Sequence, residues 1–155
     1  MKHIKNIWCI SATTATILLS AQILCITAEI SYGELIDKIT ILTIKINTIT
    51  NKEKLKNIQT ELNSLHDTYN HWVGNNNEIT QLQQELQAVN QELWNVEDAI
   101  RIKERNQEFD EEFITIARSV YIINDKRCAL KKRIDILLGS YITEEKSYEE
   151  HTPNT

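Results

Sequence analysis

Apolar residues recur at helical spacing over the last third of the chain. They advance in steps of four and three residues at Phe109, Phe113, Ile116, Val120, Ile123, Leu130, Ile134 and Leu137. This period predicts one long amphipathic helix. Arg127 occupies the one slot of the stripe that is not apolar, and a polar group there can fix register or partner choice. Asp110 as an N-cap and Gly139 as the terminating residue set the predicted limits at about 110–138.

The segment before this helix has the most regular pattern of the chain. Its apolar positions fill three heptads: Ile79, Leu82, Leu86, Val89, Leu93, Val96 and Ile100. A helix over about 78–104 is therefore predicted, ending at the polar stretch 104–108. Because the loop to the next helix is short, the two should form a long, coiled-coil-like antiparallel hairpin.

Two further helices are predicted upstream. Ser31 and Glu34 form a capping box, so the first helix should begin near Tyr32. Apolar residues cover most of its circumference between Leu35 and Ile49, which is typical of a buried helix. A second capping box, Thr50 to Glu53, should start the next helix, which ends at Gly74 and the run 75–77.

Composition agrees with an all-α fold. The 155 residues include only three Gly and one Pro, which leaves too little turn chemistry for a many-stranded β protein. Hydrophobic residues make up 41% and charged residues 25%, as in chains that fold. The prediction is an antiparallel helical bundle of about four helices, forming a single domain over 29–148. Residues 140–148 should pack back on this bundle, and 149–155 should form a disordered tail.

The N-terminal segment has a different character. Residues 7–26 carry no charge and follow Lys2 and Lys5. This arrangement predicts a signal or membrane-anchor segment over 1–28, so that the protein would be exported or anchored. An N-terminal helix packed on the domain, or an over-long start site in a cytoplasmic protein, are the alternatives. Contact with a membrane is expected only through 7–26, if that segment is retained.

Charge and motifs exclude several classes of function. The net charge is −5, and without residues 1–28 there are 15 basic against 22 acidic groups, which does not suit nucleic-acid binding. Among the cysteines, only Cys128 lies outside the N-terminal segment, where it should be a small apolar residue. The sequence contains no zinc spacing, phosphate loop or nucleophile elbow. No cofactor is therefore evident, and no catalytic residue can be assigned.

A second face of the last predicted helix provides candidate ligand-binding residues. Arg118, Tyr121 and Asp125 share this face, and Asn124 lies beside them. A guanidinium, a phenol and a carboxylate on a partly apolar face can bind a polar or anionic ligand, or they can tie two helices together. Basic residues of two helices complete the candidate set, which is Lys38, Arg118, Tyr121, Asn124, Asp125 and Lys131.

Two pairs of acidic residues are candidates for a metal. Glu34 and Asp37 are three residues apart on the first predicted helix, a spacing with which carboxylates share a metal in helical bundles. Glu97 and Asp98 lie midway along the third. The alternative is structural: acids favoured by the helix dipole, and solvated ion pairs such as Glu97 with Arg101.

Several pieces of the sequence, in order, resemble a small uncharacterised bacterial family, one of the domains of unknown function. They are GELIDKITIL from Gly33, LW from Leu93, Glu97-Asp98, ARSVY from Ala117, Asn124-Asp125, Leu130-Lys131, Gly139-Ser140 and EEKSY from Glu144. The resemblance covers about residues 30–148 and implies no activity, ligand or catalytic residue. Members begin close to the first capping box, so the segment before Ile30 is a departure from the family.

Two hypotheses of function follow. The first, which we favour, is a non-enzymatic helical interaction or structural module, acting as a homo-oligomer or with a helical protein partner. The second is a small all-α enzyme or binding domain for an anionic metabolite, with or without a metal. The second gains support if charged residues from three helices converge on one concave site.

Overall fold

The computed structural model describes residues 26–145 and 147, and these contain four helices and no strand. The helices are α1 (Tyr32–Thr48), α2 (Lys52–Trp72), α3 (Asn77–Asn106) and α4 (Glu111–Leu138). The predicted all-α fold is confirmed. Residues 1–25 of the predicted signal or anchor segment, and the predicted tail 149–155, lie outside the described residues.

The helix ends follow the capping chemistry of the sequence, with one correction. Ser31 Oγ accepts from the Glu34 N–H at 3.1 Å, and Asp110 Oδ1 accepts from the Phe113 N–H at 2.9 Å. Gly139 has a φ of +64°, the left-handed conformation that terminates α4. The prediction of Thr50 as the cap of the second helix was wrong. Asn51 is the N-cap and accepts from the Lys54 N–H at 3.0 Å, because an amide oxygen one residue later reaches the same orphan donors.

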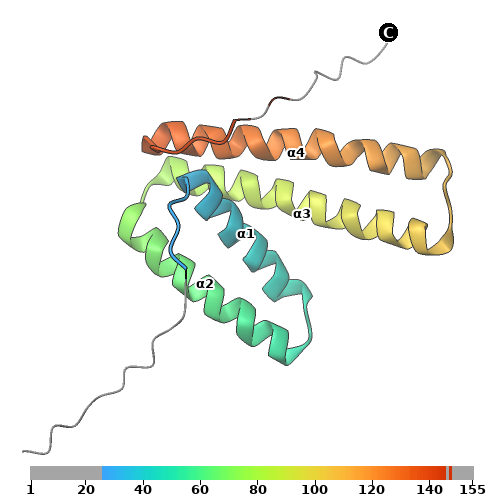
Figure 1. Ribbon diagram of the computed structural model, residues 1–155, viewed down its shortest axis with the longest axis horizontal. Helices are drawn as coiled ribbons and strands as arrows, with labels where there is room; N and C mark the ends of the chain where they lie inside the picture. Colours follow the sequence, from blue (N-terminus) through green and yellow to red (C-terminus); the bar gives the residue numbers. More distant parts are fainter. Residues whose placement is uncertain (1–25, 146, 148–155) are drawn as a thin grey trace, which may run out of the picture.

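The helices form two antiparallel hairpins that cross, as Figure 1 shows. α3 and α4 make the longer hairpin, and α1 and α2 make the shorter one. α1 lies at the centre of the molecule and packs against all three other helices. α2 packs chiefly on α1, and its C-terminal end, with Tyr69 and the cap residue Val73, reaches the cluster that contains Ile79 of α3. The central place of α1 accounts for its nearly all-round apolar sequence.

Two apolar clusters hold the hairpins together. One lies where α1 meets α3 and α4, and it comprises Ile36, Ile79, Leu82, Leu86, Leu130 and Ile134. The other lies between α1 and α2, and it comprises Leu35, Ile39, Leu42 and Leu62. α1 supplies four of the ten buried residues of these clusters and contributes to both, so this helix links them.

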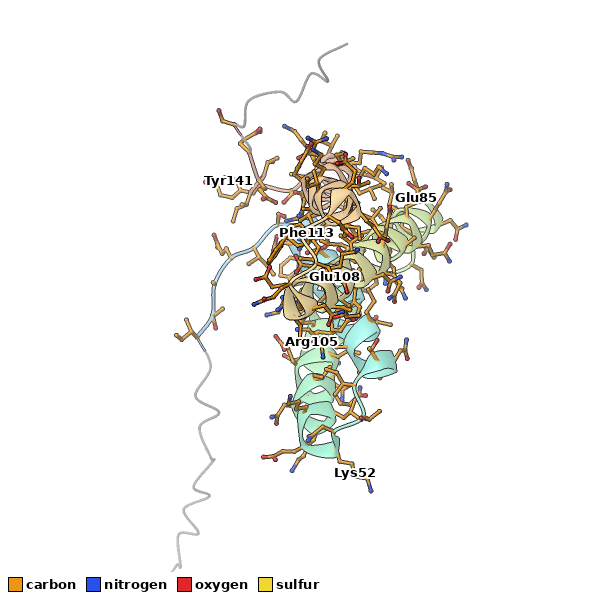
Figure 2. All side chains as sticks on the ribbon, turned by 90° about the vertical axis from the view of Figure 1, so that its right-hand side faces the viewer. Lys52, Glu85, Arg105, Glu108, Phe113 and Tyr141 are labelled. Carbon is orange, nitrogen blue, oxygen red and sulfur yellow. The ribbon has the colours of Figure 1, made fainter. Side chains whose placement is uncertain are left out.

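The loop end of the long hairpin extends beyond α1 and α2 (Figure 1). We call residues 91–122 the distal arm. Figure 2 shows this arm nearly end-on, with Arg105, Glu108 and Phe113 near its tip and Lys52 at the far end of the short hairpin. No residue of the distal arm is buried, although its apolar stripe continues that of the core.

After Gly139 the described residues contact α4 through two ion pairs, whereas Tyr141 is 95% exposed. Glu144 pairs with Lys131, and Glu145 pairs with Lys132 at 3.0 Å. None of the helices in the described part of the chain is long and apolar enough to cross a membrane.

Candidate functional site

Buried polar residues gather where α1 crosses α3 and α4. Asp37 of α1 is only 1% exposed, yet its carboxylate meets donors from both other helices. Asn90 of α3 donates to Asp37 Oδ1 at 2.8 Å and to Thr40 Oγ1 at 2.8 Å. Arg127 of α4 donates from Nε to Asp37 Oδ1 at 2.9 Å, and from Nη2 to Oδ2. We call Asp37, Thr40, Asn90, Asn124 and Arg127 the polar junction.

The polar junction satisfies a charge that would otherwise be costly to bury. Its two-pronged contact with Arg127 has the fork geometry that suits a guanidinium and a carboxylate. The hydrogen bond to Asp37 is the largest cause that raises the pKa of Arg127 above its ordinary value, and burial opposes it. Arg127 Nη1 also donates to Asn124 Oδ1 at 3.4 Å. About a quarter of the Arg127 side chain, 26%, remains exposed.

A second ionic cluster lies one helical turn further along α4. Lys131 is 6% exposed, and its Nζ donates to Glu34 of α1 and to Glu144 of the returning chain. Burial lowers the pKa of Lys131, but the hydrogen bonds to Glu144 and Glu34 outweigh it and leave the pKa raised. Lys131 therefore ties three segments together as a structural cation.

The start of α1 approaches α4 very closely. The Gly33 N–H donates to Asp135 Oδ1 at 2.6 Å, and the other carboxylate oxygen is buried without a hydrogen-bond partner among the described residues. A Cβ on Gly33 would lie 2.6 Å from the Lys131 carbonyl oxygen, so the contact requires glycine. This glycine and Asp135 fix how α1 crosses α4.

A pocket of about 460 Å³ opens beside the polar junction. Its size falls in the range of small-molecule and side-chain pockets. Three helices line it through Ile41, Asn90, Leu93, Trp94, Glu97, Asp98, Arg101 and Arg127. Along α3 the lining runs from Asn90 to Arg101, about 16 Å at the helical rise. We call this pocket the groove, because it lies along the root of the distal arm.

The structure divides the candidate ligand-binding residues between two faces of α4 and the surface of α1. Asn124 joins the polar junction through Arg127, and Lys131 pairs with Glu34 of α1. Arg118, Tyr121 and Asp125 are exposed on the distal arm and just beyond it. Lys38 is exposed and pairs with Glu61 of α2 at 2.7 Å. The six residues are thus not brought together in one place.

The candidate metal residues also separate into two sets. Glu34 pairs with Lys131, and Asp37 pairs with Arg127. Glu97 and Asp98 line the groove, where Glu97 pairs with Arg101 at 3.3 Å. Among the described residues, no group of three or more His, Cys, Asp or Glu is placed to hold a metal ion.

Sequence reasoning missed Asn90 and Asp135 and did not assign a partner to Arg127. Asn90 lies four residues after Leu86 and three before Leu93, so a lone amide in the apolar stripe was an available signal. Arg127 gave the same signal in α4. What could not be foreseen is that both point at Asp37, which is separated from them by 53 and 90 residues in the chain.

Fold and site define the chain as an all-α helical-bundle protein whose helices are joined by buried ion pairs, with a groove and an open arm beside them. The chain belongs to a family of unknown function (DUF6165), whose model matches residues 26–155. This confirms the predicted membership of a family of unknown function. No curated protein and no solved structure matches the chain.

Proposed function

We propose that this protein is a non-enzymatic interaction module that binds a helix of another polypeptide along the groove and the distal arm. Helices gain most of their stability in proteins by packing an apolar face. In the proximal half of the long hairpin, α1 covers that face. In the distal half the same stripe continues without a covering helix.

The observation that carries this proposal is the change in burial along the hairpin. Ile79, Leu82 and Leu86 of α3 are at most 3% exposed. Beyond Asn90, the next apolar residues of the stripe, Leu93, Val96 and Ile100, are only half-buried. The arm also exposes large apolar residues, namely Ile102, Phe109, Ile114, Tyr121 and Ile122. We propose that these side chains, together with the half-buried stripe, form the surface that a partner covers.

The groove gives the proposed surface a defined starting point. Ile41 of α1 and Leu93 and Trp94 of α3 supply its apolar lining. A helix laid in an apolar groove typically anchors one or two side chains in such a pocket. The partner helix would thus begin at the groove, where α1 ceases to cover the apolar stripe, and extend along the distal arm.

A site for an anionic metabolite receives less support. Three of the cations that such a site would use are already matched: Lys131 by Glu34 and Glu144, Arg127 by Asp37, and Lys38 by Glu61. Arg118 is exposed on the distal arm and does not line the groove. Three helices do converge at the groove, but their charges are mostly paired with one another.

Two matched tryptophan substitutions test the proposal. The probe is a fluorescent amphipathic peptide of about 18 residues, about 27 Å long as a helix, with leucines on one face and glutamines on the other. Trp94→Ala in the full chain should weaken binding of this peptide about tenfold or more. A tryptophan that becomes buried at an interface typically contributes much of the binding energy. Trp72→Ala is the control, since Trp72 is 64% exposed on α2 and does not line the groove.

Fluorescence anisotropy measures the dissociation constants, and urea unfolding verifies that both variants are folded. A peptide that does not bind, or one that binds equally to both variants, would contradict the proposal.

A further inference from the structure

We infer that the helix bound by the groove and distal arm is basic, and that it anchors a lysine or arginine between Trp94 and Asp98. The inference rests on the proposed function and names the chemistry of its partner. The pairing of charges within the groove, the aromatic side chain beside the unmatched charge, and the charge of the whole arm each support it.

One of the charged residues that line the groove has no ion-pair partner among the described residues. Of the four charged residues that line it, Arg127 is held by Asp37, and Arg101 is held by Glu97. Asp98 has no ion-pair or hydrogen-bond partner among the described residues. The groove therefore presents one unmatched carboxylate.

The unmatched carboxylate lies beside an aromatic side chain. Trp94 and Asp98 are four residues apart on α3, so they share one face of the helix. Trp94 is half-buried and lines the same groove. A lysine or arginine next to both would donate a charge-assisted hydrogen bond to the carboxylate and be attracted to the indole ring. Its aliphatic stem would lie against Ile41 and Leu93.

The distal arm as a whole carries the complementary charge for a basic helix. Between positions 91 and 122 there are eight acidic and four basic residues, a net charge of −4 out of the −5 of the full chain. Such a surface attracts a positively charged partner over long range. A second copy of this chain would bring the same −4 against the arm, so self-association through this surface is disfavoured.

Three peptides of identical apolar face test the inference on the full chain. The neutral peptide described above is compared with versions that carry lysine or glutamate in place of the flanking glutamines. At low ionic strength the basic peptide should bind at least about tenfold more tightly than the neutral one, and the advantage should shrink as salt screens the charges. The acidic peptide should bind more weakly than the neutral one.

A matched pair of variants locates the anchor. Asp98→Asn should weaken binding of the basic peptide about fivefold or more and leave the neutral peptide unaffected. Asp67→Asn makes the same change of charge at an exposed position of α2, outside the groove and the distal arm, and should have no such effect. Light scattering on the full chain, without peptide, establishes its mass.

The outcomes separate the inference from the proposed function. Equal binding of the neutral and basic peptides, with loss in Trp94→Ala, would overturn the basic partner and leave the interaction module standing. The basic partner is likewise overturned if the protein is a dimer that Trp94→Ala dissociates, because the occupant would then be a second copy. If none of the peptides binds and the protein is a monomer, both ideas fail.

Discussion

At the residue scale, the Asp37–Arg127 pair decides how α1 sits on the long hairpin. Both charged groups of a buried ion pair lose their hydration. The net contribution of the pair to stability is therefore small compared with that of an apolar pair of the same volume. Its value lies in specificity, because any other crossing of the helices would leave Asp37 buried without a donor. Asn90 reinforces this by bridging Asp37 and Thr40 at 2.8 Å each.

The cost of breaking this pair can be measured with an isosteric change. Asp37→Asn removes the charge opposite Arg127, and we expect the free energy of unfolding to fall by about 2–3 kcal/mol. The value lies below that of a fully enclosed pair because 26% of the Arg127 side chain reaches water. Glu61→Gln, in the exposed pair with Lys38, is the matched control and should cost less than about 1 kcal/mol. Urea unfolding measures both, and equal losses would show that the junction has no special role.

At the element scale, the helices could be predicted closely and their contacts only in part. Ser31, Asp110 and Gly139 cap the predicted helices because capping is local chemistry within one turn. The apolar stripe of α3 predicted which face of that helix is buried. It did not predict that α1 covers only half of the length of α3. Arg127 was visible as an exception to its stripe, whereas its partner depends on the crossing of α1, which no local pattern encodes.

The hairpin loop gives a pH-dependent test at this scale. Asp110 caps α4 through the Phe113 N–H, and its carboxylate also pairs with Lys103 of α3 at 2.9 Å. The backbone hydrogen bond from Phe113, followed by that from Lys103, lowers the pKa of Asp110 below its ordinary value of 3.8. The charged form is thus favoured in the folded state, and its contribution is present above pH 3.8 and lost as the pH falls through the lower, folded pKa.

Asp110→Asn keeps a good N-cap and removes the charge. We expect the wild-type protein to have the higher urea midpoint at neutral pH and the two midpoints to converge under acid conditions. A difference that stays constant at every pH, or widens in acid, would be inconsistent with this role of the carboxylate.

At the scale of the whole molecule, the two halves of the long hairpin differ in what covers them. The proximal half shares a core with α1, and the clusters around Ile36 and Leu35 make α1 indispensable to the fold. The distal arm has only its own two helices and a net charge of −4. Regions with few buried apolar contacts open more readily than the core. The arm should therefore be the part of the described chain that a partner stabilises most.

The most direct test of this account is hydrogen exchange of the full chain, measured by mass spectrometry with and without the basic amphipathic peptide. In the free protein, amides of 91–106 and 111–122 should exchange faster than those of 79–90 and 123–138. The peptide should slow exchange in 91–106 and 111–122 and leave α2, residues 52–72, unchanged. Protection confined to α2, or no protection of the distal arm under conditions where the peptide is bound, would contradict the claim that this arm is a helix-binding surface.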